Sequence, residues 1–441
     1  MTELRIIHSS KTYAIENTQN DTEKQQKFGT PMHQTSSSGP QIPISPTLKT
    51  QGESLPACRR SNRAHEGLLG IATLLALLYH SNQTVRGFYA LDALMLVTAF
   101  LATSNLIREQ LEFGHINVEA YYSRTIKRYA PAAIFVLATT SLAILLVGNT
   151  TEKNESFPIV LATLGQFANW QQLLSGVPSW DSTTKIHPFA AMWTISLVAQ
   201  FLIVLPLLFK FLWASSRNKL GLFTTYWLVL ATVGASISPL LATTHTTERL
   251  YLGSDTHALP FLCGSLFATV SSLLQQRPKA TPATDHKSSK SAVLWTGMAL
   301  LAIFAIVVEH FLNEYVQKYP SGLIVICLGL GLLCLSLSMK TIYLHTFFGF
   351  PPFRALGSLS YEILLIHLPV FWALHTAFPT LSPITLLVYG GLATYALSNF
   401  AHFRITRLRF HKPWYEPRWN NWPLINLIAT LLMTTTGLAI Y

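Results

Sequence analysis

Charged residues are scarce in this chain. Asp, Glu, Lys and Arg make up 12% of its 441 residues, whereas a soluble domain carries roughly 25%. This deficit excludes an ordinary water-soluble protein, since hydrophobic residues reach 50%. The apolar alternation of barrel strands is missing as well, so helices are the way to satisfy the backbone in lipid. The composition therefore predicts an all-α, polytopic membrane protein.

Cysteine is rare and poorly placed for metal or disulfide chemistry. None of the four cysteines forms a CxxC pair, and three of them lie in apolar runs. This excludes a disulfide framework and favours small packing residues, so we expect no metal site and no bound cofactor. The sequence also has no GxSxG or HExxH motif, which excludes a catalytic domain of the soluble type.

Apolar runs of about 20 residues, the length that crosses a bilayer as a helix, recur from residue 67 onward. We expect about 10–11 transmembrane helices between residues 63 and 441, preceded by a polar, disordered cytoplasmic tail at 1–62. The expected spans are 66–84, 88–106, 129–148, 189–213, 220–243, 256–274, 291–311, 321–338, 357–376, 382–402 and 422–441.

The basic residues follow the loops of this arrangement. With the N-terminal tail inside, 26 of the 31 Lys and Arg residues lie inside and five outside. This bias predicts a cytoplasmic N-terminus and an external C-terminus in the plasma membrane. The net charge of +11 is explained by the same bias, so we expect the lipid bilayer as a partner and no nucleic acid.

Two connecting segments have features of their own. Residues 114–131, GHINVEAYYSRTIKRYAP, have apolar and basic residues at helical spacing and predict an interfacial helix on the cytoplasmic surface before the third span. The longest outside loop is expected at about 149–188.

His80 is the most informative single residue, because an ionisable group inside an apolar span is costly. Asp92 lies near the outer start of the second span, so antiparallel helices would bring the two to similar depth. A carboxylate there can orient an imidazole that acts as a general base. A structural hydrogen bond of His80 to a neighbouring helix is the alternative.

Further polar residues fall within or beside the spans. Arg124 and Arg128 share a helical face and suit either a phosphate-bearing cytosolic ligand or interfacial anchoring. His367 lies mid-span, one or two turns above Ser360 and Tyr361, and serves either chemistry or a helix–helix hydrogen bond. The sixth span opens with Asp255 and His257, which together indicate a wet outer cavity.

Several segments of the chain, taken in their order along the sequence, resemble the acyltransferase family 3 membrane proteins. These are integral O-acyltransferases that modify envelope glycans. The resemblance covers about residues 60–440 and is closest to the membrane half of peptidoglycan O-acetyltransferases, without their extracytoplasmic esterase-like domain. The segments that carry it are EGLLGIATLLALLYHSN, GFYALDALMLVTAFLAT, YYSRTIKRYAP, FANW, MWTISLVAQF, YLGSDTHALPFLCGSLFA and LGSLSYEILLIHLPVF.

The resemblance implies transfer of an acyl group, acetyl in the first place, from cytosolic acyl-CoA to an envelope glycan. Either a separate extracytoplasmic esterase-like partner completes this transfer, or the chain is a shortened relative. It implies that His80, Asp92 and His367 are catalytic and that Arg124 and Arg128 bind the donor. The residues it places on the substrate path or in structural support are Trp193, Gln200, Asp255, His257, Ser360 and Tyr361.

The chain departs from the family pattern where the family usually has charged residues. It has Leu69 in place of an arginine, Val198 and Ala199 in place of a glutamate, and His257 in place of an arginine. Two alternatives therefore stay open beside the enzyme. One is a catalytically degenerate relative that acts as a scaffold, and the other is a transporter of a polar substrate.

Overall fold

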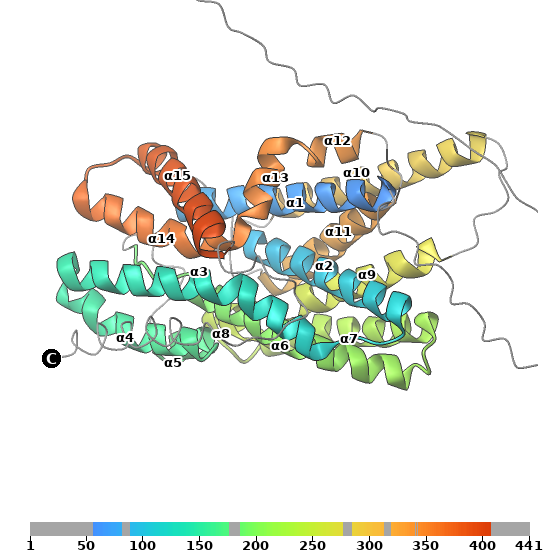
Figure 1. Cartoon of the computed structure of the whole chain (residues 1–441), viewed down its shortest axis with the longest axis horizontal. Helices are drawn as coiled ribbons and strands as arrows, with labels where there is room; N and C mark the ends of the chain where they lie inside the picture. The colour runs from blue at the N-terminus through green and yellow to red at the C-terminus, as the bar shows by residue number, and fades with distance from the viewer. Residues whose placement is uncertain are drawn as a thin grey trace, which may run out of the picture. The chain divides into compact units, whose positions relative to one another are not determined.

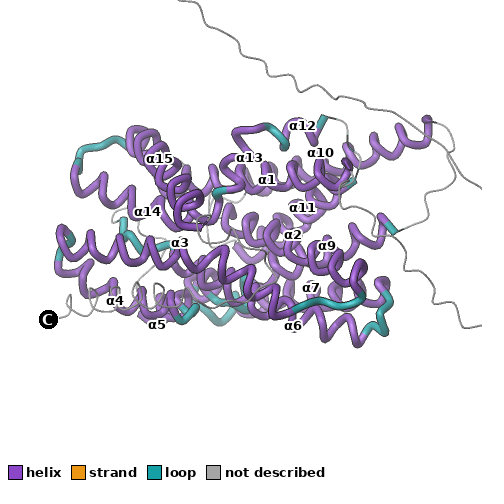
Figure 2. The backbone as a smooth tube through the Cα atoms, in the orientation of Figure 1, coloured by secondary structure: helices purple, strands orange, loops and turns teal. Residues whose placement is uncertain are grey.

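The computed structural model describes residues 56–81, 89–175, 186–276, 285–312, 319–339, 341 and 343–406. Every regular element in this part of the chain is helical (Figure 2), which confirms the all-α prediction. Most of the predicted tail at 1–62 and the last predicted span at 422–441 lie outside the described residues.

The first half of the fold comprises eight helices. Their bounds are α1 (Pro56–His80), α2 (Tyr89–Phe113), α3 (Val118–Val147), α4 (Thr150–Leu164), α5 (Ala168–Ser175), α6 (Met192–Ser215), α7 (Leu220–Leu241) and α8 (Thr247–Leu252). The second half comprises α9 (Ala258–Gln275), α10 (Asp285–Leu312), α11 (Tyr319–Ser338), α12 (Leu344–Phe348), α13 (Pro351–Ser358), α14 (Ser360–Ala377), α15 (Pro383–Phe400) and the π-helical turn η2 (Ala401–Thr406).

Seven described helices are long and apolar enough to cross a membrane, namely α2, α3, α6, α7, α9, the apolar part of α10, and α15 continued into η2. The pair α13 and α14, bent by 76° at Leu359, can be counted as an eighth. We expected α1 and α11 as spans too. They fall outside this group, since α1 carries charged residues in its first half and the apolar part of α11 is short. The protein is thus a multi-pass membrane protein.

One of the two expectations about the connecting segments is wrong. Residues 118–131 do not form a separate interfacial helix, because they continue without a break into the third span as α3. Asn117 begins this helix by accepting a hydrogen bond from the backbone N–H of Ala120, and Pro131 lies inside it. The expected outside loop at 149–188 contains α4 and α5, and α4 begins with a capping box formed by Asn149 and Glu152.

Glycines bring the helices that carry the polar residues close together. The backbone of α1 at Gly70 contacts the carbonyl of Phe353 and the N–H of Gly357 in α13, where a side chain would collide. Gly264 of α9 contacts the backbone of Leu96 in α2 in the same way. In Figure 1, α2 lies between α1 and α9, and all three pack together. These contacts therefore set the position of α1 against α13 and of α2 against α9.

Candidate functional site

His80 and His367 form a pair of imidazoles in ring contact inside the helix assembly. His80 is the last residue of α1, and His367 lies in the middle of α14. Their ring centroids are 4.9 Å apart, with the planes tilted by 49°. Leu77 and Phe371, one turn away on the same two helices, are buried in one apolar cluster. The structure therefore brings together the two histidines that the sequence singled out.

The tautomer of His367 follows from its hydrogen bond. Its Nδ1 lies 3.0 Å from the carbonyl oxygen of Ile363, which can only accept, so Nδ1 carries the proton. In the neutral ring the lone pair is then on Nε2. The Nε2 atoms of His367 and His80 are both buried, and neither has a hydrogen-bond partner among the described residues. Such a nitrogen can accept a proton or attack a carbonyl carbon.

Asp92 lies against His257, whereas we expected it to orient His80. Its Oδ1 is 3.3 Å from Nε2 of His257, and both side chains are fully buried. The rings of Trp193 and Tyr251 enclose His257, with centroids 5.7 and 5.5 Å from its own. The packing of α2 against α9 brings Asp92 to the N-terminus of α9, where His257 is the N-cap residue. A buried carboxylate needs such a partner.

A hydrogen-bonded network beside this pair ties α5 and α6 to the segment before α9. Asn169 donates to the carbonyl of Leu252 (2.9 Å) and to the hydroxyl of Ser254 (3.0 Å). Gln200 donates to Asn169 (2.9 Å) and accepts from Ser254 (2.6 Å). Trp170 also donates to Ser254 (3.1 Å). Gln200 therefore has a structural role in this network. Its expected position on the substrate path stays a prediction.

Asp255 is held by an arginine. The two terminal nitrogens of the Arg249 guanidinium, Nη1 and Nη2, donate to the carboxylate oxygens Oδ1 and Oδ2 of Asp255, at 2.8 and 2.7 Å. These bonds lower the pKa of Asp255 and raise that of Arg249. The guanidinium also lies 5.1 Å from the ring centroid of Trp170. Asp255 is thus a bidentate ion-pair partner, and the wet outer cavity expected here stays a prediction.

Arg124 and Arg128 lie on the exposed surface of α3. Arg124 Nη2 is 3.1 Å from Glu109 Oε2, with the arginine side chain 47% exposed. The Arg128 guanidinium lies over the ring of Tyr129, 5.5 Å from its centroid. Their exposure is consistent with binding an anionic ligand, and their pairing is equally consistent with surface anchoring. Both alternatives from the sequence therefore stay open.

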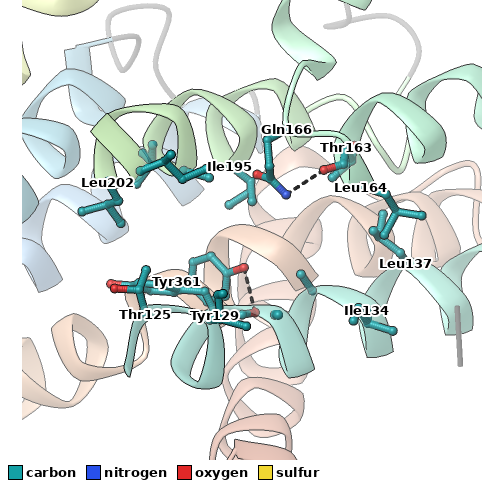
Figure 3. Close-up of a pocket in the computed structure, with 16 residues that line it drawn as sticks. Thr125, Tyr129, Ile134, Leu137, Thr163, Leu164, Gln166, Ile195, Leu202 and Tyr361 are labelled. Atoms are coloured by element: carbon teal, nitrogen blue, oxygen red, sulfur yellow. Dashed lines mark hydrogen bonds between the residues drawn. The ribbon is translucent and has the colours of Figure 1, made fainter. Parts of the chain in front are cut away.

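Ser360 begins α14 immediately after the bend, and Tyr361 follows it against α3. The Tyr361 hydroxyl donates to the carbonyl of Tyr129, at 3.0 Å. A cavity of about 250 Å³ lies beside this contact, between α3, the end of α4, α6 and α14. Figure 3 shows Tyr361 and Thr125 on one side of it and Gln166 on the other. Val198 and Ala199 also line it, so these two departures from the family pattern lie on its wall.

Sequence reasoning missed two further polar contacts. Oε1 of the buried Glu362 is 2.8 Å from Nδ1 of His402, which joins α14 to the π-helical turn. Nε2 of His187, just before α6, lies 3.9 Å from Oε2 of Glu155 in α4. The contact of Glu362 could have been suspected from the sequence, because a carboxylate inside an apolar helix needs a partner. The sequence gives no such indication for His187, because this residue lies in a polar connecting segment.

The remaining predicted positions are structural in this fold. Leu69 is buried in the core, where the family usually has an arginine. The cysteines Cys263, Cys327 and Cys334 are free and buried, as expected for packing residues. Among the described residues, no three His, Cys, Asp or Glu side chains are grouped so that they could hold a metal ion.

Comparison with known proteins gives relatives of one kind. A peptidoglycan O-acetyltransferase of Listeria monocytogenes is 23% identical over 317 residues, which is 69% of this chain and 48% of that protein. A putative peptidoglycan O-acetyltransferase of Bacillus subtilis is 23% identical over 311 residues (69% and 48%). A putative O-acetyltransferase of Staphylococcus aureus is 23% identical over 314 residues (70% and 51%). No solved structure matches.

The chain spans about half the length of these curated relatives. The family described as an acyltransferase domain matches residues 66–403, which include the histidine pair, the Asp92–His257 pair and the cavity. Because this match covers well over half of the chain, the protein belongs to that acyltransferase family.

Proposed function

We propose that this protein transfers an acyl group, acetyl in the first place, from cytosolic acyl-CoA to a hydroxyl group of an envelope glycan. The histidine pair is the observation that carries the proposal. Two buried imidazole nitrogens face an apolar interior within the family's matched region. The names of the relatives support an O-acetyl product and a glycan acceptor.

The two histidines would share the chemistry. Nε2 of His80 would attack the thioester carbonyl, and the bond from carbon to sulfur would break as CoA leaves. Nε2 of His367, whose other nitrogen is fixed by Ile363, would accept the proton of the acceptor hydroxyl as its oxygen attacks the acyl carbon and the bond from that carbon to His80 Nε2 breaks. Release of this proton would balance the thiolate of the departed CoA. Arg124 and Arg128 would bind the phosphates of CoA. Asp92 would support this site through His257 rather than through His80.

The direction of transfer is part of the proposal. With the N-terminus in the cytoplasm, as the distribution of the basic residues predicts, the last turn of α1, and His80 with it, would be near the outside. Arg124 and Arg128 would then lie near the inner surface. A separate extracytoplasmic partner with an esterase-like site would complete delivery to the glycan.

Acetyl-CoA turnover tests this proposal. We expect purified protein in lipid vesicles to release CoA, and His80→Ala or His367→Ala to lower the rate by about 10²-fold or more. His245→Ala is the matched control, because His245 is exposed between α7 and α8. The catalytic assignment fails if His80→Ala retains the wild-type rate.

The same assay decides between the proposal and its alternatives. A wild-type protein that neither binds acetyl-CoA nor releases CoA is not a CoA-dependent acyltransferase. Flux of a polar substrate without covalent change would then support the transporter. Capture of envelope enzymes without flux would support the scaffold, which the apolar residues at Leu69, Val198 and Ala199 favour.

A further inference from the structure

The cavity beside Tyr361 is almost wholly apolar. Its α3 wall runs from Thr125 to Leu137, and its α6 wall from Ile195 to Ile203. Aliphatic and aromatic side chains dominate both walls, so a polar occupant would lose its hydrogen bonds to water without replacement. The chemistry of the walls therefore selects a hydrocarbon chain.

The cavity opens sideways, toward lipid. Ile126 and Ile203 line it and are 56% and 48% exposed on two helices apolar enough to cross the membrane. The Tyr122 hydroxyl donates to the carbonyl of Ile203 at 2.6 Å and joins α3 to α6 one turn of α3 before Ile126. A chain would enter between the two helices beside this contact.

The depth of the cavity matches one leaflet. The 30 residues of α3 extend about 45 Å, whereas the hydrocarbon core is about 30 Å thick. The excess leaves the first part of the helix, with its basic residues, at the head-group level. From Thr125 to Leu137 the helix rises about 18 Å, close to the half-thickness of that core.

The charge at the entrance selects the head group. Arg124, Lys127 and Arg128 lie on α3 within one turn of the lining residues Thr125 and Tyr129. Basic residues at this level attract anionic lipids, by about 1 kcal/mol each. The charge at the entrance and the apolar interior are therefore complementary to an anionic phospholipid.

The cavity is separate from the histidine pair. Tyr361 faces α3 and the cavity, whereas His367, six residues later on α14, faces His80 of α1. Six residues turn a helix by about 240° beyond a full turn, so the two side chains lie on different faces. A chain in the cavity would contact Tyr361 without reaching the imidazoles.

We propose that this cavity between α3, α6 and α14 is a binding site for one acyl chain of an anionic phospholipid whose head group lies at Arg124, Lys127 and Arg128. Arg124 and Arg128 are also the proposed ligands of the CoA phosphates, so the lipid head group and the acyl donor would compete for them. A bound chain would make the packing of α14 against α3 dependent on lipid composition.

Photolabelling tests the site directly. The probe is phosphatidylglycerol with a diazirine near the end of one chain, present as a minor component of phosphatidylcholine vesicles that contain the full chain and no acyl-CoA. We expect the label on residues that line the cavity, such as Leu137 and Ile195, and unlabelled phosphatidylglycerol to compete better than phosphatidylcholine.

A substitution that fills the cavity with a larger side chain tests whether the label depends on this site. Ala199→Phe, or Ala133→Phe on the opposite wall if the first does not fold, should lower labelling of the cavity by about tenfold. Val204→Phe, on a lipid-facing position of α6 that is 53% exposed, is the matched control and should change nothing.

Three results would overturn the proposal. One is labelling spread evenly over the lipid-facing helices and unchanged by Ala199→Phe. Another is equal competition by the two lipids, which would remove the head-group preference. The last is displacement of the label by palmitoyl-CoA but not by phosphatidylglycerol, which would make the donor's chain the occupant. Because no turnover is measured, these results are independent of the proposed activity.

Discussion

At the scale of single residues, the fold pairs several of the ionisable side chains that the sequence places in apolar surroundings. Asp92 lies against His257, Glu362 against His402, and the Nδ1 of His367 against a backbone carbonyl. Such pairing offsets part of the cost of removing these groups from water. The Nε2 atoms of His80 and His367 have no hydrogen-bond partner among the described residues, and their rings lie together, which makes both histidines candidates for chemistry.

A double-mutant cycle measures the Asp92–His257 contact. We expect Asp92→Asn and His257→Gln each to lower the thermal stability of the purified protein, because each leaves the other buried group without its partner. The double variant should lose less than the sum, with a coupling of about 1–3 kcal/mol.

The neutral pair Thr103–Ser265, which joins the same two helices at 2.9 Å, is the control for this cycle. Its coupling should be about 1 kcal/mol or less. Strictly additive losses for Asp92 and His257 would contradict the pairing.

At the scale of the elements, close backbone contacts decide where the polar residues lie. The packing of α1 on α12 depends on Gly67 and its packing on α13 depends on Gly70 and Gly357, and none of these glycines has room for a side chain. Because α1 ends at His80 and α13 leads through a 76° bend into α14, this contact also sets how α1 meets the helix of His367.

Alanine substitutions at two glycines test this dependence. Gly70→Ala should push α13 away from α1 and lower the free energy of unfolding by about 1–3 kcal/mol, as overpacking does. Gly221→Ala in α7 has open space around it and should be neutral or stabilise by up to about 1 kcal/mol. Melting temperatures in detergent compare the two, and equal shifts would refute the argument.

At the scale of the whole molecule, polar contacts join α4 to α14 and to the segment before α6. Trp372 of α14 donates to Glu152 of α4 at 2.8 Å. The nearby His187 is largely buried, and its Nδ1 accepts from the N–H of Phe189 at 3.2 Å. Burial lowers the pKa of His187 from 6.5 to about 4.

This lowered pKa makes the assembly acid-sensitive. Above pH 6.5, His187 is neutral in both the folded and the unfolded chain and costs nothing. As the pH falls from 6.5 toward 4, the unfolded chain binds a proton that the folded chain does not, so stability decreases by at most about 3 kcal/mol.

His187→Gln, which keeps an acceptor, should flatten the melting temperature over that range relative to the wild type. His115→Gln, an exposed histidine at the start of the segment before α3, should leave the pH dependence unchanged. A wild-type slope that persists in His187→Gln would show that another group titrates.

The sequence by itself determined the class of the protein, the positions of most membrane-spanning helices, the family, and which ionisable residues lie in apolar segments. These follow from local composition, because apolar length and charge distribution are properties of contiguous segments. It did not predict the unbroken course of α3 through residues 118–131, since its amphipathic start and its apolar remainder carry different signals.

Only the tertiary structure decided the partners. The sequence favoured His80 with Asp92, whereas the fold pairs His80 with His367 and Asp92 with His257. Which face of each helix meets which neighbour depends on packing between distant segments, here on glycines that let α1, α2, α9 and α13 approach closely. The cavity between α3, α6 and α14 also arises from packing between distant segments, so no local sequence pattern predicts it.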